Sequence, residues 1–202
     1  MPKTGLRGRT RVTATYQSEL ILGGARSGKS QRALALGRQS AGPTAFLATA
    51  PALDSDMRAR IARHRAERPS GWTTVEEPFE IVPACRRLAG RHVLVVVDCL
   101  TLWVSNRLHR GDGDEAIVDG ADELAKFMAE RAISLILVSN EVGTGVHPPT
   151  EVGWRFSQLL GSVNQRVAAA ADRVTLMVAG IPLTIKDAPL PAGSHGRPPE
   201  AP

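Results

Sequence analysis

Short apolar segments alternate with amphipathic ones along most of the chain. Residues 93–97 (Val-Leu-Val-Val-Val) and 133–138 are apolar almost throughout, which is typical of strands that helices cover on both faces. Between such segments, apolar residues recur at helical spacing. The pattern predicts strands at 18–22, 44–49, 72–76, 92–98, 133–139, 173–180 and 183–186. It predicts helices at 29–40, 53–67, 79–89, 99–109, 114–131 and 150–171.

The most specific motif directly follows the first predicted strand. Residues 23–30 read Gly-Gly-Ala-Arg-Ser-Gly-Lys-Ser and match the phosphate-loop pattern G-x-x-x-x-G-K-[ST]. Glycines let backbone N–H groups point at phosphate oxygens, and the following helix adds positive potential at its N-terminus. Lys29 is expected to reach the β- and γ-phosphates, and Ser30 to hold Mg²⁺. A glycine-rich turn that matches by chance is the alternative, but the flanking strand and helix favour a nucleoside triphosphate site.

The order of strands and helices predicts the fold class. Alternating strands and helices are typical of an α/β fold whose right-handed crossovers place helices on both faces of a mostly parallel sheet. We expect one phosphate-loop domain over residues 18–187, with a sheet of about seven strands like that of phosphate-loop nucleoside triphosphatases. We expect residues 1–17 to form a flexible basic extension. Residues 188–202 contain five prolines and two glycines, and they are expected to form a flexible tail.

Composition and charge exclude several classes of protein. The 202 residues carry a net charge of +5, but four of these charges come from Lys3, Arg7, Arg9 and Arg11, before any acidic residue. The remainder is nearly neutral, so no nucleic-acid groove is expected. No apolar run approaches the roughly 18 residues of a membrane span, and no secretory signal precedes the first strand. The two cysteines, Cys85 and Cys99, are expected in the core of a cytoplasmic protein.

Polar residues follow several of the predicted strands. Functional groups gather beyond the carboxyl ends of parallel strands, so Thr49, Asp98 and Asn140 are expected at one continuous site. Asp98 closes a strongly apolar strand, where a carboxylate of phosphate-loop proteins orients Mg²⁺ directly or through water. Aspartate is also favoured as a helix N-cap. The sequence leaves both interpretations of Asp98 open.

A histidine on the second predicted helix is a candidate nucleophile. Met57, Ile61 and His64 lie at positions i, i+4 and i+7, so the three share one helical face. The rest of this helix carries four arginines, Arg58, Arg60, Arg63 and Arg65. An imidazole surrounded by guanidinium groups is suited to attack a phosphorus atom. Periodicity alone nevertheless favours a histidine that merely packs.

These segments together resemble one family. The phosphate loop, Met57 to Pro69, Asn140-Glu141-Val142-Gly143 and residues 163–172 (Val-Asn-Gln-Arg-Val-Ala-Ala-Ala-Ala-Asp) are similar to the bifunctional adenosylcobinamide kinase / adenosylcobinamide-phosphate guanylyltransferase of cobalamin biosynthesis. The resemblance runs from about Glu19 to Lys186. It implies that a nucleoside triphosphate, ATP or GTP, phosphorylates adenosylcobinamide. It further implies that GTP guanylylates a histidine, which passes GMP to adenosylcobinamide phosphate and so gives adenosylcobinamide-GDP.

The same resemblance assigns roles to individual residues. His64 falls at the guanylylated histidine, and Lys29 joins it as a catalytic residue. Ser30 and Asp98 are the expected Mg²⁺ residues, although other members carry Glu at the position of Asp98. The residues expected to bind nucleotide are Gly23, Gly24, Ala25, Arg26, Ser27, Gly28, Lys29, Ser30, Ala48, Thr49, Ala50, Arg65, Ala66, Glu67, Arg68, Glu76 and Asp98. Family members form homo-oligomers, often trimers, so a second copy of the chain is an expected partner.

Several questions stay open at the level of sequence. No general base for the kinase step stands out, and Glu76 and Asp98 are the carboxylates to test. Asn164 is either a cobinamide-side or a structural residue, and the alanine run after it favours the structural role. A plain small-molecule kinase and a GTP-binding module are competing functions, as is a member that has lost one activity. The module lacks support, because no Asn-Lys-x-Asp-like guanine-reading segment is present.

Overall fold

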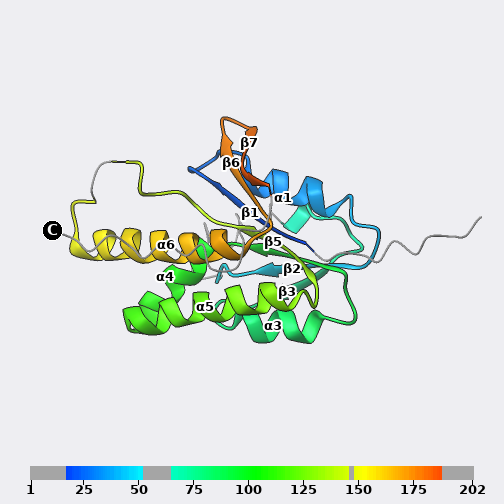
Figure 1. Ribbon diagram of the computed structural model, residues 1–202, viewed down its shortest axis with the longest axis horizontal. Helices are drawn as coiled ribbons and strands as arrows, with labels where there is room; N and C mark the ends of the chain where they lie inside the picture. The colour runs from blue at the N-terminus through cyan, green and yellow to red at the C-terminus, as the bar shows by residue number, and fades with distance from the viewer. Residues whose placement is uncertain (1–16, 52–64, 146–147, 188–202) are drawn as a thin grey trace, which may run out of the picture.

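A seven-stranded sheet forms the centre of the protein, as the computed structural model shows (Figure 1). The structure describes residues 17–51, 65–145 and 148–187. The strand order is β3-β2-β4-β5-β1-β6-β7, with β7 antiparallel to β6 and all other pairs parallel. The strands are β1 (Ser18–Gly23), β2 (Thr44–Ala48), β3 (Thr73–Glu76), β4 (Leu94–Asp98), β5 (Ser134–Val138), β6 (Arg173–Val178) and β7 (Ile181–Asp187).

Helices cover both faces of this sheet. They are α1 (Lys29–Gly37), α3 (Ile81–Leu88), α4 (Leu100–Arg110), α5 (Asp114–Glu130) and α6 (Glu151–Ala170). Figure 1 shows α1 on one side of the sheet and α3, α4, α5 and α6 on the other. Alternate strand residues separate into two apolar clusters accordingly: Ile21 and Phe46 pack with α1, whereas Leu20 and Leu47 pack with the larger helical layer. The predicted mostly parallel α/β fold is confirmed.

The predicted elements agree with the structure apart from their ends. All seven strands and five of the six helices are present. The remaining helix, predicted at 53–67, lies mostly outside the described residues, of which Arg65 and Ala66 are helical. The predicted extension (1–17, apart from Gln17) and tail (188–202) also lie outside them.

One boundary differs because of a tight turn. The strand expected at 173–180 ends at Val178, and β7 begins at Ile181 instead of residue 183. Ala179 and Gly180 have φ values of 50° and 83°. Two successive positive φ values are typical of the two-residue turn of a β-hairpin. The turn therefore replaces the last residues of the predicted strand.

The register of the strands brings their carboxyl ends level with one another. Glu76 pairs with Ala48, Ala48 with Asp98, and Asp98 with Val138. Val138 pairs with Ile21 of β1, which continues for two residues to Gly23. We call this row of strand ends the carboxyl edge. No helix in the described part of the chain is long and apolar enough to span a bilayer.

Candidate active site

The phosphate loop lies at the centre of the carboxyl edge, between β1 and α1. Its turn is closed by the Ser27 N–H, which donates to the Gly24 carbonyl at 3.3 Å. Gly28 precedes α1 with φ 97° and ψ 8°, a left-handed conformation that favours glycine. A Cβ atom at Gly28 would lie 3.3 Å from the Cα of Gly180, in the β6–β7 turn. The Gly180 N–H donates to the Ser27 carbonyl at 3.0 Å, so this turn supports the loop from outside.

Lys29 is held against the loop that precedes it. Its side chain begins α1, and the residue is only 8% exposed. The ammonium donates to the Gly24 carbonyl at 2.6 Å and lies 3.5 Å from the Ser27 hydroxyl. The charge is therefore fixed beside the loop backbone, which is where a phosphate-loop lysine meets the β- and γ-phosphates.

Thr49 joins the ends of β2 and β4. It is fully buried, and its N–H donates to the Asp98 carbonyl at 3.1 Å. Its hydroxyl lies 2.7 Å from both the N–H and the carbonyl oxygen of Cys99. Among the three neighbours expected to contact nucleotide, Ala48 and Thr49 are buried and Ala50 is partly exposed. Ala50 is thus the residue of this group that reaches the surface of the site.

Asp98 and Ser30 are the two residues predicted to hold Mg²⁺. Asp98 is the half-buried last residue of β4, and Ser30 lies in the first turn of α1. Cys99 is the N-cap residue of α4, without a side-chain capping bond, so the N-cap interpretation of Asp98 is wrong. A carboxylate and a hydroxyl suit Mg²⁺, which is usually bound by one or two protein oxygens together with phosphates. The described residues contain no cluster of three or more His, Cys, Asp or Glu side chains that could hold a metal without such phosphates.

Arg65 and Arg68 lie beside β2 and β3. The guanidinium of Arg68 stacks over the Phe46 ring, 3.7 Å from its centroid, and donates to the Thr74 hydroxyl at 3.4 Å. Burial lowers the pKa of Arg68, against the opposing effect of the Asp98 carboxylate. Arg65 forms an exposed ion pair with Glu76 at 3.9 Å. These contacts bring the predicted residues Arg65, Arg68, Glu76 and Asp98 to the same part of the carboxyl edge.

Two of the remaining predicted residues, Ala66 and Glu67, have exposed side chains next to Arg65. The Glu67 carbonyl accepts a hydrogen bond from Arg38 at 2.8 Å, which attaches this segment to the end of α1. Within the phosphate loop, Ala25 and Arg26 are exposed. The predicted nucleophile His64 lies outside the described residues.

A second set of contacts connects β5 to the phosphate loop. The Asn164 side chain, 5% exposed, donates to the Asn140 carbonyl at 3.0 Å. The Asn140 N–H donates to the Thr101 hydroxyl at 2.7 Å, and the Glu141 N–H donates to the Gly23 carbonyl at 3.1 Å. These bonds favour the structural role for Asn164. Sequence reasoning placed Thr101 at the end of a predicted strand, three residues after Asp98, but assigned it no role.

Comparison with known proteins identifies relatives over nearly the whole described chain. Residues 19–185 match the family model for cobinamide kinase / cobinamide phosphate guanyltransferase. The bifunctional adenosylcobalamin biosynthesis protein CobP of Pseudomonas aeruginosa is 43% identical over 173 residues, which cover 85% of this chain and 99% of that protein. CobU of Escherichia coli is 36% identical, and CobU of Salmonella typhimurium is 35% identical. Each of these alignments covers 83% of this chain and 98% of the relative.

A solved structure supports the fold assignment. An ATPase from the type III secretion system of pathogenic bacteria aligns with a TM-score of 0.52 and 13% sequence identity. The alignment covers 79% of this chain and 50% of the ATPase chain, so the two proteins share a core that is about half of the larger one. At this identity the likeness concerns the fold alone.

Proposed function

The chain belongs to the cobinamide kinase / cobinamide phosphate guanyltransferase family, and from this we propose that it catalyses two steps of adenosylcobalamin biosynthesis. In the first, a nucleoside triphosphate phosphorylates the aminopropanol hydroxyl of adenosylcobinamide. In the second, GMP from GTP passes to adenosylcobinamide phosphate, and pyrophosphate is released. The observation that carries the proposal is the phosphate loop of residues 23–30 at the carboxyl edge, inside a family match over residues 19–185.

For the kinase step, the loop and Lys29 bind the triphosphate. The Lys29 ammonium exchanges its 2.6 Å contact with the Gly24 carbonyl for phosphate oxygens. Ser30 and Asp98 would hold Mg²⁺, which supplies positive charge to the phosphates when bound. Phosphoryl transfer depends mainly on positioning and on neutralisation of charge. We therefore assign no dedicated base, and Glu76 and Asp98 are the carboxylates whose replacement would reveal one.

For the guanylyl transfer, we propose that His64 is the nucleophile. A nitrogen of its neutral imidazole forms a bond to the α-phosphorus of GTP while the bond to the β-phosphate oxygen breaks, and pyrophosphate leaves. A phosphate oxygen of adenosylcobinamide phosphate then attacks the same phosphorus, and the imidazole leaves. Arg65 and Arg68 stabilise the departing pyrophosphate, and their positive charge also favours neutral imidazole.

We also propose that the protein acts in the cytoplasm as a homo-oligomer. Val178, Ile181, Leu183 and Ile185 on the β6–β7 hairpin are 56–69% exposed, and β7 is the last strand of the sheet. An apolar edge strand of this kind is typical of an interface, and the adjoining turn contacts the phosphate loop. Light scattering after gel filtration should give a mass above the 21.6 kDa of one chain, and Leu183→Lys should reduce it. A wild-type mass of one chain would contradict this part of the proposal.

The test of the proposed function is a product assay. Purified protein is incubated with adenosylcobinamide, Mg²⁺ and either ATP or GTP, and the corrinoids are identified by mass spectrometry. Adenosylcobinamide phosphate is expected with whichever of ATP and GTP the enzyme accepts as phosphate donor. Adenosylcobinamide-GDP is expected only with GTP. Formation of the phosphate alone would identify a plain kinase, and nucleotide binding with neither product would identify a binding module. Lys29→Met serves as the control for contaminating kinases.

A further inference from the structure

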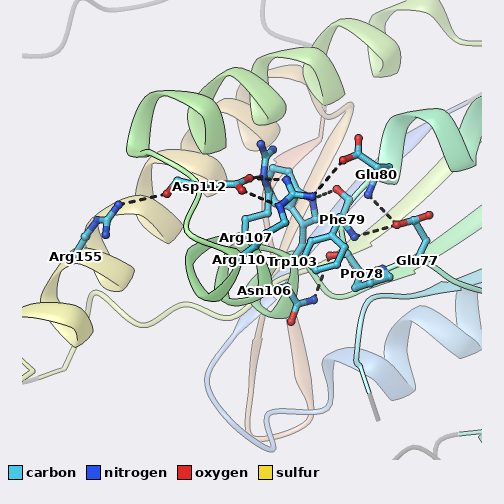
Figure 2. A network of polar contacts seen from close by, with 10 residues as sticks. All are labelled: Glu77, Pro78, Phe79, Glu80, Trp103, Asn106, Arg107, Arg110, Asp112 and Arg155. Carbon is cyan, nitrogen blue, oxygen red and sulfur yellow. Dashed lines mark hydrogen bonds and ion pairs between the residues drawn. The ribbon is translucent and has the colours of Figure 1, made fainter. Parts of the chain in front are cut away.

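Asn106 connects the two strand-end segments on one side of the phosphate loop. It lies on α4, and its side-chain amide donates to the Thr49 carbonyl at 2.7 Å and to the Pro78 carbonyl at 3.1 Å. Thr49 follows β2, and Pro78 follows β3 two residues after Glu76. Figure 2 shows the Asn106 side chain pointing from α4 toward Pro78. The Glu77 N–H donates to the Ala48 carbonyl at 2.9 Å, and the Asn106 amide joins the same two segments one residue further on, at Thr49 and Pro78.

The effect of Asn106 extends to Asp98 through Thr49. The Thr49 N–H donates to the Asp98 carbonyl, and its hydroxyl bonds both backbone groups of Cys99. A displacement of Thr49 would therefore shift the backbone of Asp98 as well as that of its neighbour Ala50. Both residues belong to the proposed nucleotide site, whereas Asn106 lies on α4 and is not among the predicted nucleotide contacts.

We propose that Asn106 is a positioning residue for the nucleotide, which acts by holding the 49–50 and 76–78 segments at the separation that a bound triphosphate requires. This inference rests on the proposed function, since it takes Ala50, Glu76 and Asp98 to be nucleotide contacts. No motif in the sequence points to Asn106, because its partners Thr49 and Pro78 lie 57 and 28 residues away along the chain.

Trp103, on the same helix, provides a matched control. It is 3% exposed, and its indole N–H donates to the Phe79 carbonyl at 2.7 Å. Trp103 thus forms a hydrogen bond to the segment after β3 and, within the described part of the chain, none to Thr49. Figure 2 shows both side chains directed at the same segment. Trp103→Phe removes one hydrogen bond and some packing but leaves both Asn106 bonds in place.

The experiment measures the affinity for a non-hydrolysable GTP analogue by calorimetry, together with the thermal midpoint of each variant. Asn106→Ala should raise Kd roughly tenfold, because two hydrogen bonds that order the site are lost. Asn106→Asp keeps the shape but replaces the donor with a charged acceptor facing two carbonyls, so its Kd should rise at least as much. Asn106→Ser, which keeps one hydroxyl donor, should fall between wild type and Asn106→Ala. Trp103→Phe should lower the thermal midpoint and leave Kd within about twofold of wild type.

Two results would overturn the inference. One is that Asn106→Ala binds the analogue with the wild-type Kd. If the alanine variant does not fold, a wild-type Kd for Asn106→Ser has the same meaning. The other is an equal rise in Kd for Trp103→Phe, which would mean that any loosening of this region has the same effect. The binding measurement uses no cobinamide. A wild-type protein that binds the analogue but makes neither product would therefore refute the proposed function while the test of Asn106 still stands.

Discussion

Gly23→Ala tests whether the phosphate loop requires the packing that the structure gives it. Gly23 is buried at the end of β1 and has φ 150°, a value that L side chains rarely adopt. A Cβ atom there would lie 2.5 Å from the carbonyl oxygen of Met177 and 2.6 Å from the Ser27 hydroxyl. Met177 is the β6 partner of Gly23, so its carbonyl cannot withdraw without disturbing the pairing of β1 with β6.

The size of the effect follows from these two contacts. Overpacking of a tight site lowers the free energy of unfolding by roughly 1–3 kcal/mol, and a strained φ adds about 1 kcal/mol or more. We therefore expect Gly23→Ala to lower the free energy of unfolding by roughly 3 kcal/mol, which corresponds to about 6–12 °C in a domain of this size. Nucleotide affinity should fall as well, because the distorted residue begins the loop.

The matched control is the next residue. A Cβ atom at Gly24 would meet no heavy atom within 4 Å, and Gly24 is exposed. Gly24→Ala should therefore shift the thermal midpoint by no more than about 2 °C. The assay is differential scanning calorimetry of both variants under one set of conditions. Equal midpoints for the two variants would refute the packing argument.

Three further outcomes follow from individual side chains. Lys29→Met should reduce kcat/KM for the kinase reaction by about 100-fold or more, since a charge preorganised toward the phosphates is lost; activity within a fewfold of wild type would contradict its role. Hydrogen bonds from Arg110, and also from Arg107, hold the pKa of the Asp112 carboxyl below its ordinary value of 3.8. The stabilisation of the folded state by the ionised carboxylate is therefore complete above about pH 4 and declines as the pH falls toward the folded-state pKa. Urea titrations should show a smaller loss of stability on acidification for Asp112→Asn than for wild type, and equal losses would refute this. Burial raises the pKa of both thiols to about 12, with Asp98 contributing at Cys99, so roughly one thiol in 10⁴ is ionised at pH 8. Iodoacetamide should react slowly with the folded protein, with the half-buried Cys99 ahead of the buried Cys85, and rapid labelling of either would contradict the burial argument.

The sequence was sufficient to predict the fold, because periodicity carries that information directly. Apolar runs such as 93–97 form interior strands in the structure. Residues 23–30, with the glycine and lysine spacing of a phosphate loop, connect β1 to α1. The β6–β7 turn was misplaced because it uses Ala179 at positive φ. Alanine in that conformation is rare, so the turn signal of Gly180 was placed inside the predicted strand.

The supporting contacts of the site could not be predicted in the same way. Thr101 and Asn106 lie on α4 and Asn164 lies on α6, and each side chain forms a hydrogen bond with backbone groups at the carboxyl edge. Their partners are backbone carbonyls and N–H groups, which leave no mark on the partner's residue type. The Asn106 bonds in particular cross 57 and 28 residues of sequence. Such pairings are set by tertiary packing and become visible only in the folded chain.

The measurement that tests the central claim most directly is labelling with GTP that carries ³²P at the α-phosphate. Purified wild type and His64→Ala are incubated with this GTP and Mg²⁺ and then separated by denaturing electrophoresis. The account predicts a label on wild type that is acid-labile, stable to alkali, and absent from His64→Ala. A wild-type chain that binds GTP and remains unlabelled would contradict guanylyl transfer through His64.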